Sequence, residues 1–296
     1  MEQSPLTDRI LKGFEAMSSQ LQAAARHVLD HPRDVALLSM REQARRAGVQ
    51  PATMTRLAKH LGFEGFEEIR ALHADVLRER DLGFAGKAGA QVTSQKQHGD
   101  KALAGEMLRS AASQIERLGQ DRTLERIVAA AETLASARRV YSLGLRSSHP
   151  VAWHLHYVLT LLGERSILLD GIAGTGADGL ATATGEDVLF VASVAPYTRL
   201  SVELAEHAAA LGLRVVAVTD SAVAPLAQMA AQAVIVPTDT PSFFHTMTPA
   251  FLVAEILATL IAGKAEEGAL EALRRMDGHL AALDTHLKPS QTRKRK

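Results

Sequence analysis

The chain has 296 residues, of which 47% are hydrophobic and 22% charged, a balance typical of a globular protein with a sizeable core. It contains no cysteine, which excludes disulfides, thiolate metal sites and cysteine nucleophiles. Its formal net charge is zero, so contact with nucleic acid would have to rest on a local basic patch.

The N-terminal segment and the hydropathy pattern bear on location. The segment carries Glu2 and Asp8 without a long apolar run, which is not typical of a signal peptide. No uninterrupted apolar stretch is long enough to span a bilayer. We therefore expect a cytoplasmic protein without a membrane partner. The histidines lack metal-ligand spacing, so we expect neither a metal nor a cofactor.

Residues 1–80 show apolar side chains at helical spacing and no strand-like alternation, which predicts an all-helical domain. Positive charge is concentrated in one part of it. Between Ser39 and His60, Glu42 is the single acidic residue. The basic residues of this stretch are Arg41, Arg45, Arg46, Arg56 and Lys59.

The same stretch has the start and stop signals of two short helices. Ser39 suits the N-cap of a helix that runs to Ala47. Gly48 can take the left-handed conformation that ends a helix, and Pro51 suits the first turn of the next one. The second helix has an inner face formed by Met54, Leu57, Ala58 and Leu61. The pattern predicts a helix-turn-helix.

The second helix would then present polar residues outward, namely Gln50, Thr53, Thr55, Arg56 and Lys59. Cationic and amide side chains at the front of such a helix are what entry into the major groove of DNA requires. We predict that these five residues contact double-stranded DNA. The alternative is a helical hairpin with a solvated basic face.

The remaining chain divides further. Residues 81–100 are small and polar without an apolar face, which predicts a linker or a frayed helix end. Residues 101–287 form a second predicted domain, which begins with helices near Ala102–Leu118 and Thr123–Ser136. Residues 288–296 form a basic tail.

Short apolar runs alternate with helical stretches in this second domain, which predicts a five-stranded, doubly wound, flavodoxin-like parallel sheet. Ligands of such sheets bind beyond the carboxyl ends of the strands. The predicted strands are Arg139–Leu143, Ser166–Leu169, Val188–Ala192, Arg214–Thr219 and Ala233–Val236. The predicted helices are Val151–Leu162, Thr175–Thr184, Arg199–Leu211, Ala224–Met229, Phe251–Ile261 and Leu270–Leu287.

The stretch from Ala47 to Phe66 resembles the DNA-binding signature of the RpiR-type transcription regulators. The resemblance is carried by the Thr-x-x-Arg element Thr53 to Arg56 and by Leu-Gly-Phe-x-Gly-Phe, Leu61 to Phe66. In that family a helical DNA-binding domain precedes a sugar-isomerase (SIS) domain that binds phosphosugars. The resemblance covers nearly the whole chain, and it implies a regulator without enzymatic activity that pairs as a homodimer or homotetramer.

The first ligand loop implied by the resemblance contains Gly144, Arg146, Ser147 and Ser148. A glycine turn with hydroxyls at a helix N-terminus favours an anion. The family pattern is Gly-x-Gly-x-Ser, so Arg146 replaces the second glycine. Its guanidinium can bind a carboxylate or phosphate. Alternatively, it points to solvent or pairs with a neighbouring subunit.

The second ligand loop resembles the family pattern Ser-x-Ser-Gly-x-Thr, which Ser193 and Thr198 match. Ala195 and Pro196 depart from it, which removes a hydroxyl, an N–H and flexibility. We therefore expect the effector to be a small anionic metabolite, a sugar phosphate or a sugar acid, with Tyr197 shaping specificity.

One further effector residue and two other functions remain open. His245 can reach the same site from the loop that follows the fifth strand. One alternative function is a sugar-phosphate isomerase, which needs a base such as Glu255. The other is a regulatory binding module that does not contact DNA.

Overall fold

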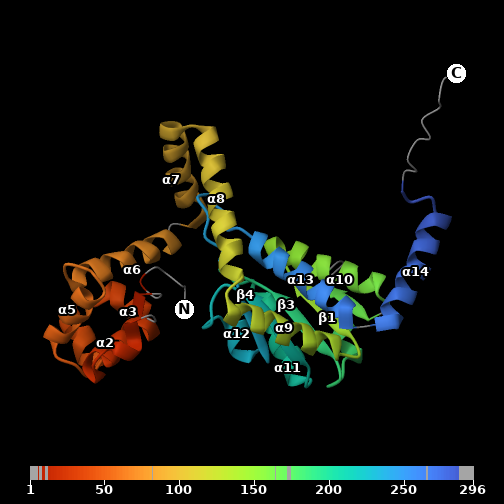
Figure 1. The fold of residues 1–296 in the computed structure, drawn as a ribbon, viewed down its shortest axis with the longest axis horizontal. Coiled ribbons are helices and arrows are strands. Elements are labelled where there is room, and N and C mark those ends of the chain that lie inside the picture. The colour runs from red at the N-terminus through yellow and green to blue at the C-terminus, as the bar shows by residue number, and fades with distance from the viewer. Residues whose placement is uncertain are drawn as a thin grey trace. The chain divides into compact units, whose positions relative to one another are not determined.

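Figure 1 shows the computed structural model, which describes residues 6, 9–10, 13–81, 83–163, 165–171, 175–264 and 266–286. The chain forms two compact units. The first comprises the residues up to Ser113 together with Asp239–Thr246, and the second comprises Gln114–Thr238 and the residues from Met247 onward. The predicted basic tail lies outside the described residues.

The described residues up to Ser113 form helices and the turns between them, without a strand, as predicted for residues 1–80. The elements of the first unit are η1 (Phe14–Ala16), α2 (Ser19–Asp30), α3 (Pro32–Leu37), α4 (Met40–Arg46), α5 (Pro51–His60), α6 (Phe66–Asp81), α7 (Gly83–His98) and the first part of α8 (Asp100–Leu118), whose residues from Gln114 on belong to the second unit. Ile10, Met54, Leu57 and Ile69 are completely buried and form the centre of its core. Helices α2 to α6 are thus held together by one apolar cluster.

The segment 81–100 corrects the expectation of a linker or frayed end. Helix α6 continues to Asp81, and Gly83–His98 forms helix α7. Helix α7 has no buried residue. Its alanine, lysine and glutamine residues favour a helix, whereas Gly86 and Gly89 do not, and it lacks the apolar stripe on which the sequence argument relied.

The second unit contains the predicted parallel sheet, in the order β2-β1-β3-β4-β5. The strands are β1 (Val140–Gly144), β2 (Ser166–Leu169), β3 (Val188–Ala192), β4 (Arg214–Thr219) and β5 (Gln232–Ile235). The helices are α9 (Asp121–Ala135), η2 (Arg146–Ser148), α10 (His149–Leu161), η4 (Asp178–Thr182), α11 (Arg199–Ala210), α12 (Pro225–Met229), α13 (Thr248–Lys264) and α14 (Glu266–Ala282). This order confirms the doubly wound prediction. The predicted helix 175–184 is a short 3₁₀ turn, η4.

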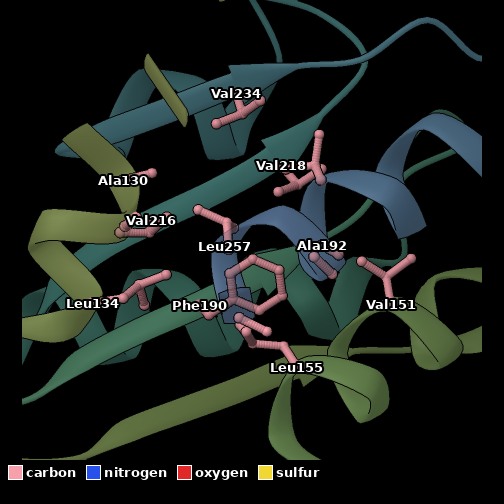
Figure 2. Close-up of a cluster of buried hydrophobic side chains, with 14 of the residues drawn as sticks. Ala130, Leu134, Val151, Leu155, Phe190, Ala192, Val216, Val218, Val234 and Leu257 are labelled. Atoms are coloured by element: carbon pink, nitrogen blue, oxygen red, sulfur yellow. The ribbon is translucent and has the colours of Figure 1, made fainter. Parts of the chain in front are cut away.

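Two apolar layers cover the sheet. One cluster joins it to α9, α10 and α13, and Figure 2 shows Phe190 and Val218 of the strands facing Leu155 of α10 and Leu257 of α13. The other cluster joins the opposite face to η4, α11 and α12. Helices α10 and α11 therefore leave the sheet on opposite faces, and this reversal lies between β1 and β3.

No single helix among the described residues is long and apolar enough to cross a membrane. Helix α13 and the Gly268–Ala282 part of α14, bent by 110° to each other, meet the length and composition of a span only when taken together.

Candidate functional site

The helix-turn-helix forms through the local signals that the sequence predicted. The Ser39 hydroxyl accepts a hydrogen bond from the Glu42 N–H at 3.3 Å and so caps α4. Gly48 has a φ of +67°, which is the left-handed turn expected after α4. Pro51 occupies the first position of α5. Each signal acts within a few residues, so the sequence alone predicts it well.

Helix α5 corrects the prediction in one respect, because Thr53 does not point outward. Its side chain is buried, with 1% exposed, on the face that also carries the completely buried Met54 and Leu57. Thr53 lies one turn before Leu57, which places both residues on the same side of the helix. The Thr53 hydroxyl accepts a hydrogen bond from Nη2 of Arg56 at 3.1 Å. Thr53 therefore holds the Arg56 side chain.

The other predicted DNA-contacting residues lie at or near the surface. Gln50, Arg56 and Lys59 are exposed, whereas Thr55 is half-buried with its hydroxyl 3.5 Å from Sδ of Met40. Neither Arg56 nor Lys59 forms an ion pair with a residue that the structure describes. Arg56 and Lys59 in the second half of α5 are thus available to an external anion such as a phosphate group.

The cations of α4 are in a different state. Arg45 and Arg46 both donate to the Glu42 carboxylate, at 2.6 Å and 3.1 Å, and Arg46 also reaches Asp34 at 2.7 Å. Hydrogen bonds from Arg45 and then from Arg46 lower the pKa of Glu42 to about 2. These acidic groups offset the charge of Arg45 and Arg46, whereas Arg41 of α4 forms no ion pair with a described residue and adds to the free charge of α5.

The candidate effector site lies at the carboxyl edge of the sheet, where β1 and β3 pair. Gly144 at the end of β1 is in register with Ala192, which directly precedes Ser193. A Cβ on Gly144 would lie 2.5 Å from the Ser148 carbonyl oxygen and 2.8 Å from Cβ of Ala152. Glycine is therefore required for the strand to meet the start of α10. The predicted Gly144 and Ser193 loops do leave the sheet side by side.

Three polar groups in these loops have no partner within the described chain. Ser148 and Ser193 are buried, with 3% and 2% exposed, yet neither hydroxyl hydrogen-bonds to a described residue. The exposed Arg146 guanidinium also lacks an ion pair or hydrogen bond there. The two hydroxyl oxygens are not fully enclosed by protein, so a polar ligand can reach them. The N-terminus of α10 adds a positive helix end.

The backbone of Arg146 shows what the departure from Gly-x-Gly-x-Ser involves. Arg146 has a φ of +55°, the left-handed region that favours glycine. The sequence analysis did not predict this conformation. The signal for it was the glycine that the family pattern has at this position, because glycine is typical of a positive φ. The loop thus accepts a backbone penalty and places a guanidinium where the pattern has no side chain.

The second loop and His245 complete the predicted set. Tyr197 and Thr198 are half-buried, and the Thr198 carbonyl accepts from the Ser201 N–H at 2.9 Å at the start of α11. His245 belongs to the helical unit through the segment Asp239–Thr246, where Phe244 stacks on Phe84 at 5.3 Å. Its contribution to the effector site stays a prediction.

One groove was not predicted from the sequence. It has a volume of about 430 Å³ and lies beside the start of α13. It is lined by Ile115, Met247, Thr248, Phe251, Leu252 and Glu255. The Glu255 side chain is exposed, so the base considered for an isomerase lies at the surface of this mostly apolar groove.

Comparison with known families agrees with this architecture. The model described as "Helix-turn-helix domain, rpiR family" matches residues 9–78, and the SIS domain model matches residues 133–260. The chain belongs to the RpiR family. It carries an N-terminal helix-turn-helix domain and a C-terminal SIS domain.

Individual relatives support the family at low identity. An HTH-type transcriptional regulator of Clostridium perfringens is 22% identical over 189 residues, which span 63% of this chain and 65% of that protein. The sugar isomerase domain of an RpiR transcription factor from Sphaerobacter thermophilus is 28% identical, with a TM-score of 0.54, covering 60% of this chain and 98% of that one. Vibrio vulnificus NanR in complex with ManNAc-6P is 20% identical, with a TM-score of 0.53, covering 94% and 98%. The NanR likeness shows the fold alone.

Proposed function

We propose that this RpiR-family protein binds operator DNA through α5 and that a small anionic sugar derivative, bound between the Gly144 and Ser193 loops, alters this binding. The DNA part rests on Arg56 and Lys59, two exposed cations of α5 that form no ion pair with a described residue. Gln50 and Thr55 lie on the same helix or at its cap and complete the proposed contact surface.

The proposed effector is a sugar phosphate or a sugar acid. Its anionic group would bind at the N-terminus of α10, with the Ser148 and Ser193 hydroxyls as donors and Arg146 as the charged partner. The fold shared with NanR, whose structure holds ManNAc-6P, supports a phosphorylated sugar. Ala195 and Pro196 take away donors of the usual second loop, so Arg146 would supply much of the recognition.

Regulation follows from linkage. An effector alters DNA affinity only if it binds with different affinities to two arrangements of the protein, of which one binds DNA better. Occupation of the site at the start of α10 would therefore favour one arrangement of the helix-turn-helix domains. We expect ligand and DNA to change each other's affinity by the same factor.

A salt-titrated mobility shift tests the DNA part, with the DNA upstream of the protein's own gene as probe and a random duplex as competitor. Arg56→Ala/Lys59→Ala should weaken binding and reduce the slope of log K against log salt by about 2. The matched control Arg199→Ala/Arg275→Ala removes the same charge from exposed positions on α11 and α14 and should leave the slope unchanged. Equal behaviour of both double variants would contradict α5 as the reading helix.

If the protein does not shift that DNA, a genome-wide pull-down is the next test, because the operator need not lie beside the gene. Recovery of no enriched sequence would contradict DNA binding and favour a regulatory binding module. In that case deletion of the helix-turn-helix domain would leave the biological effect intact.

Titration calorimetry tests the effector part with a panel of sugar phosphates, including ManNAc-6P, and sugar acids. A ligand of the site should lose at least about tenfold in affinity on Arg146→Ala, since a charge-assisted hydrogen bond contributes about 1.5–3 kcal/mol. Tight binding of simple aldose and ketose phosphates would contradict the proposed divergence of the second loop.

The isomerase alternative rests on Glu255, which lines the groove beside α13. Incubation of the protein with the sugar phosphates of the panel tests it directly. Turnover that disappears in Glu255→Gln would show an enzyme, whereas absence of turnover with retained ligand binding supports a sensor.

A further inference from the structure

A buried carboxylate lies at the carboxyl edge of the sheet, directly after β4. Asp220 is 9% exposed, yet it forms no ion pair with a residue that the structure describes. Its Oδ1 accepts a hydrogen bond from the Thr219 hydroxyl at 3.3 Å, the single hydrogen bond of this side chain within the described chain. Burial of a carboxylate is costly unless the group is paired or accepts several hydrogen bonds. Packing alone therefore does not account for Asp220.

The turn that follows β4 does not use this carboxylate either. Aspartate at such a position commonly accepts hydrogen bonds from the backbone of the turn. Here Ser221 takes that part: its hydroxyl accepts from the Val223 N–H at 3.3 Å, and its carbonyl accepts from the Ala224 N–H at 3.1 Å. The local backbone thus gives no reason for an acidic residue at position 220.

Asp220 lies on the face of the sheet that carries the candidate effector site. Val216 and Val218 of β4 belong to the cluster with α10 and α13 (Figure 2), and side chains alternate along a strand, so Asp220 continues this face. Gly144 meets the start of α10 on the same face. The Ser193 N–H donates to the Val218 carbonyl at 3.1 Å, so the second ligand loop begins beside the end of β4.

The strand order sets the distance between this carboxylate and the loop that carries Arg146. Strands β1, β3 and β4 are neighbours in that order. Adjacent strands are about 4.8 Å apart, so the Gly144 loop and Asp220 are about 10 Å from each other along the edge of the sheet. A hexose derivative is long enough to extend over this distance. The loop with the guanidinium and the carboxylate would thus meet opposite ends of one ligand, with the Ser193 loop between them.

We propose that Asp220 is a specificity residue of the effector site and that the effector is a sugar derivative with an anionic group at one end only. This inference rests on the proposed effector function. The anionic group binds beside Arg146, and hydroxyl groups at the other end of the sugar donate to the Asp220 carboxylate. A second phosphate or carboxylate at that end would meet a buried like charge. Sugar monophosphates and aldonic acids therefore fit the site, whereas sugar bisphosphates and aldaric acids are rejected.

Titration calorimetry of the full-length protein tests this selectivity with ligands matched in length. Aldonic acids are compared with aldaric acids, and hexitol monophosphates with hexitol bisphosphates, each in the gluco, manno and galacto configurations. The two members of a pair differ only at the end opposite the shared anionic group. The wild type should bind the member with one anionic end at least about tenfold more tightly, because the other member loses charge-assisted hydrogen bonds and gains a repulsion.

Asp220→Asn separates recognition from architecture, because the amide keeps the shape of the side chain and can donate to an anion. The variant should lose the preference for one anionic end at least about tenfold. Its thermal midpoint without ligand should equal or exceed that of the wild type, since a buried carboxylate without a cation costs free energy. Asp277→Asn removes the same charge from an exposed position of α14 and should keep the wild-type preference.

The outcomes distinguish this inference from the proposed function. An unchanged preference in Asp220→Asn, with binding that still depends on Arg146, would overturn the role of Asp220 and leave the effector site standing. A clearly lower thermal midpoint, or failure of Asp220→Asn to fold, would show that the carboxylate is structural and would also overturn that role. Binding of neither series by the wild type, or binding that does not depend on Arg146, would contradict the proposed effector function and this inference with it.

Discussion

The carbonyl oxygen of Ser148 lies so close to Gly144 that a Cβ on the glycine would be 2.5 Å from it. The end of β1 and the first turn of α10 thus pack backbone against backbone. This contact brings the helix N-terminus to the edge of the sheet, where the Ser193 loop also begins. It is the geometric basis of the candidate effector site.

Gly144→Ala should therefore disturb both stability and ligand binding. The added methyl group forces the strand and helix apart, and we expect a loss of about 1–3 kcal/mol in the free energy of unfolding. Effector binding by calorimetry should be lost as well. Gly185→Ala is the control, because its nearest neighbour would be 3.7 Å away, and it should change the stability little. A fully stable Gly144→Ala protein would contradict the close packing.

Two substitutions of Arg146 separate its charge from its backbone conformation. Arg146→Ala removes the guanidinium but keeps a side chain at a φ of +55°, whereas Arg146→Gly removes both. Both variants should lose anion affinity equally. Arg146→Gly should be the more stable by up to about 1 kcal/mol, because glycine adopts this region without steric penalty. Retained affinity in either variant would show that Arg146 does not bind the anion.

The hydrogen bond from Arg56 to Thr53 predicts coupling between a buried and an exposed residue. Thr53→Val keeps the shape of the side chain but removes the acceptor, so Arg56 loses its orientation. We expect DNA affinity to fall several-fold while the thermal transition moves by only a few degrees. In a mobility-shift cycle, Arg56→Ala/Thr53→Val should be no weaker than Arg56→Ala alone. Additive losses would mean that Thr53 acts independently of Arg56.

His27 predicts a pH dependence of the helical unit. Burial, followed by the neighbouring His31, lowers the pKa of His27 below its usual 6.5. The unfolded chain therefore takes up a proton more readily than the folded one as the pH falls below about 6.5, and stability is lost from there down to the folded pKa. Thermal unfolding of His27→Leu from about pH 7.5 to about 5 should show a smaller decrease than the wild type. The exposed His98→Gln should behave like the wild type.

Effector binding should be visible in the emission of Trp153, the single tryptophan of the chain. Arg146 to Ser148 directly precede α10, and Trp153 lies on the second turn of that helix. We expect a saturable change in Trp153 emission on addition of a ligand of the site, with a midpoint equal to the calorimetric dissociation constant. The change should be absent in Arg146→Ala at the same ligand concentrations. A titration without change would show that binding at the start of α10 does not reach the surroundings of Trp153.

Local features of this protein were predictable from its sequence because their causes lie within a few residues. Ser39, Gly48 and Pro51 act on their own helix ends, and the sequence placed the turn correctly from them. The strands Ser166–Leu169, Val188–Ala192 and Arg214–Thr219 were predicted with their observed bounds, since continuous apolar runs mark buried parallel strands. The two-domain RpiR architecture followed from these patterns and from the resemblance at Thr53 to Phe66.

The hydrophobic pattern did not predict whether a side chain at the border between the buried and exposed faces of a helix is buried. Thr53 was assigned outward because it is polar, but one turn of α5 places it beside Leu57 in the core. Helix α7 was missed because its stability does not rest on an apolar stripe. The left-handed backbone of Arg146 was not predicted, because an arginine in the sequence gives no sign of a positive φ.

Only the tertiary structure decided which distant residues meet. The order β2-β1-β3 places the Gly144 and Ser193 loops side by side, although the chain forms all of α10 and β2 between them. It also buries one side of α10 and leaves Trp153 and Tyr157 on the other. Periodicity depends on neighbours along the chain, whereas strand pairing and the choice of the buried face depend on the free energy of long-range packing. The helix-turn-helix was therefore predictable from the sequence, whereas the meeting of the Gly144 and Ser193 loops was decided by the pairing of the strands.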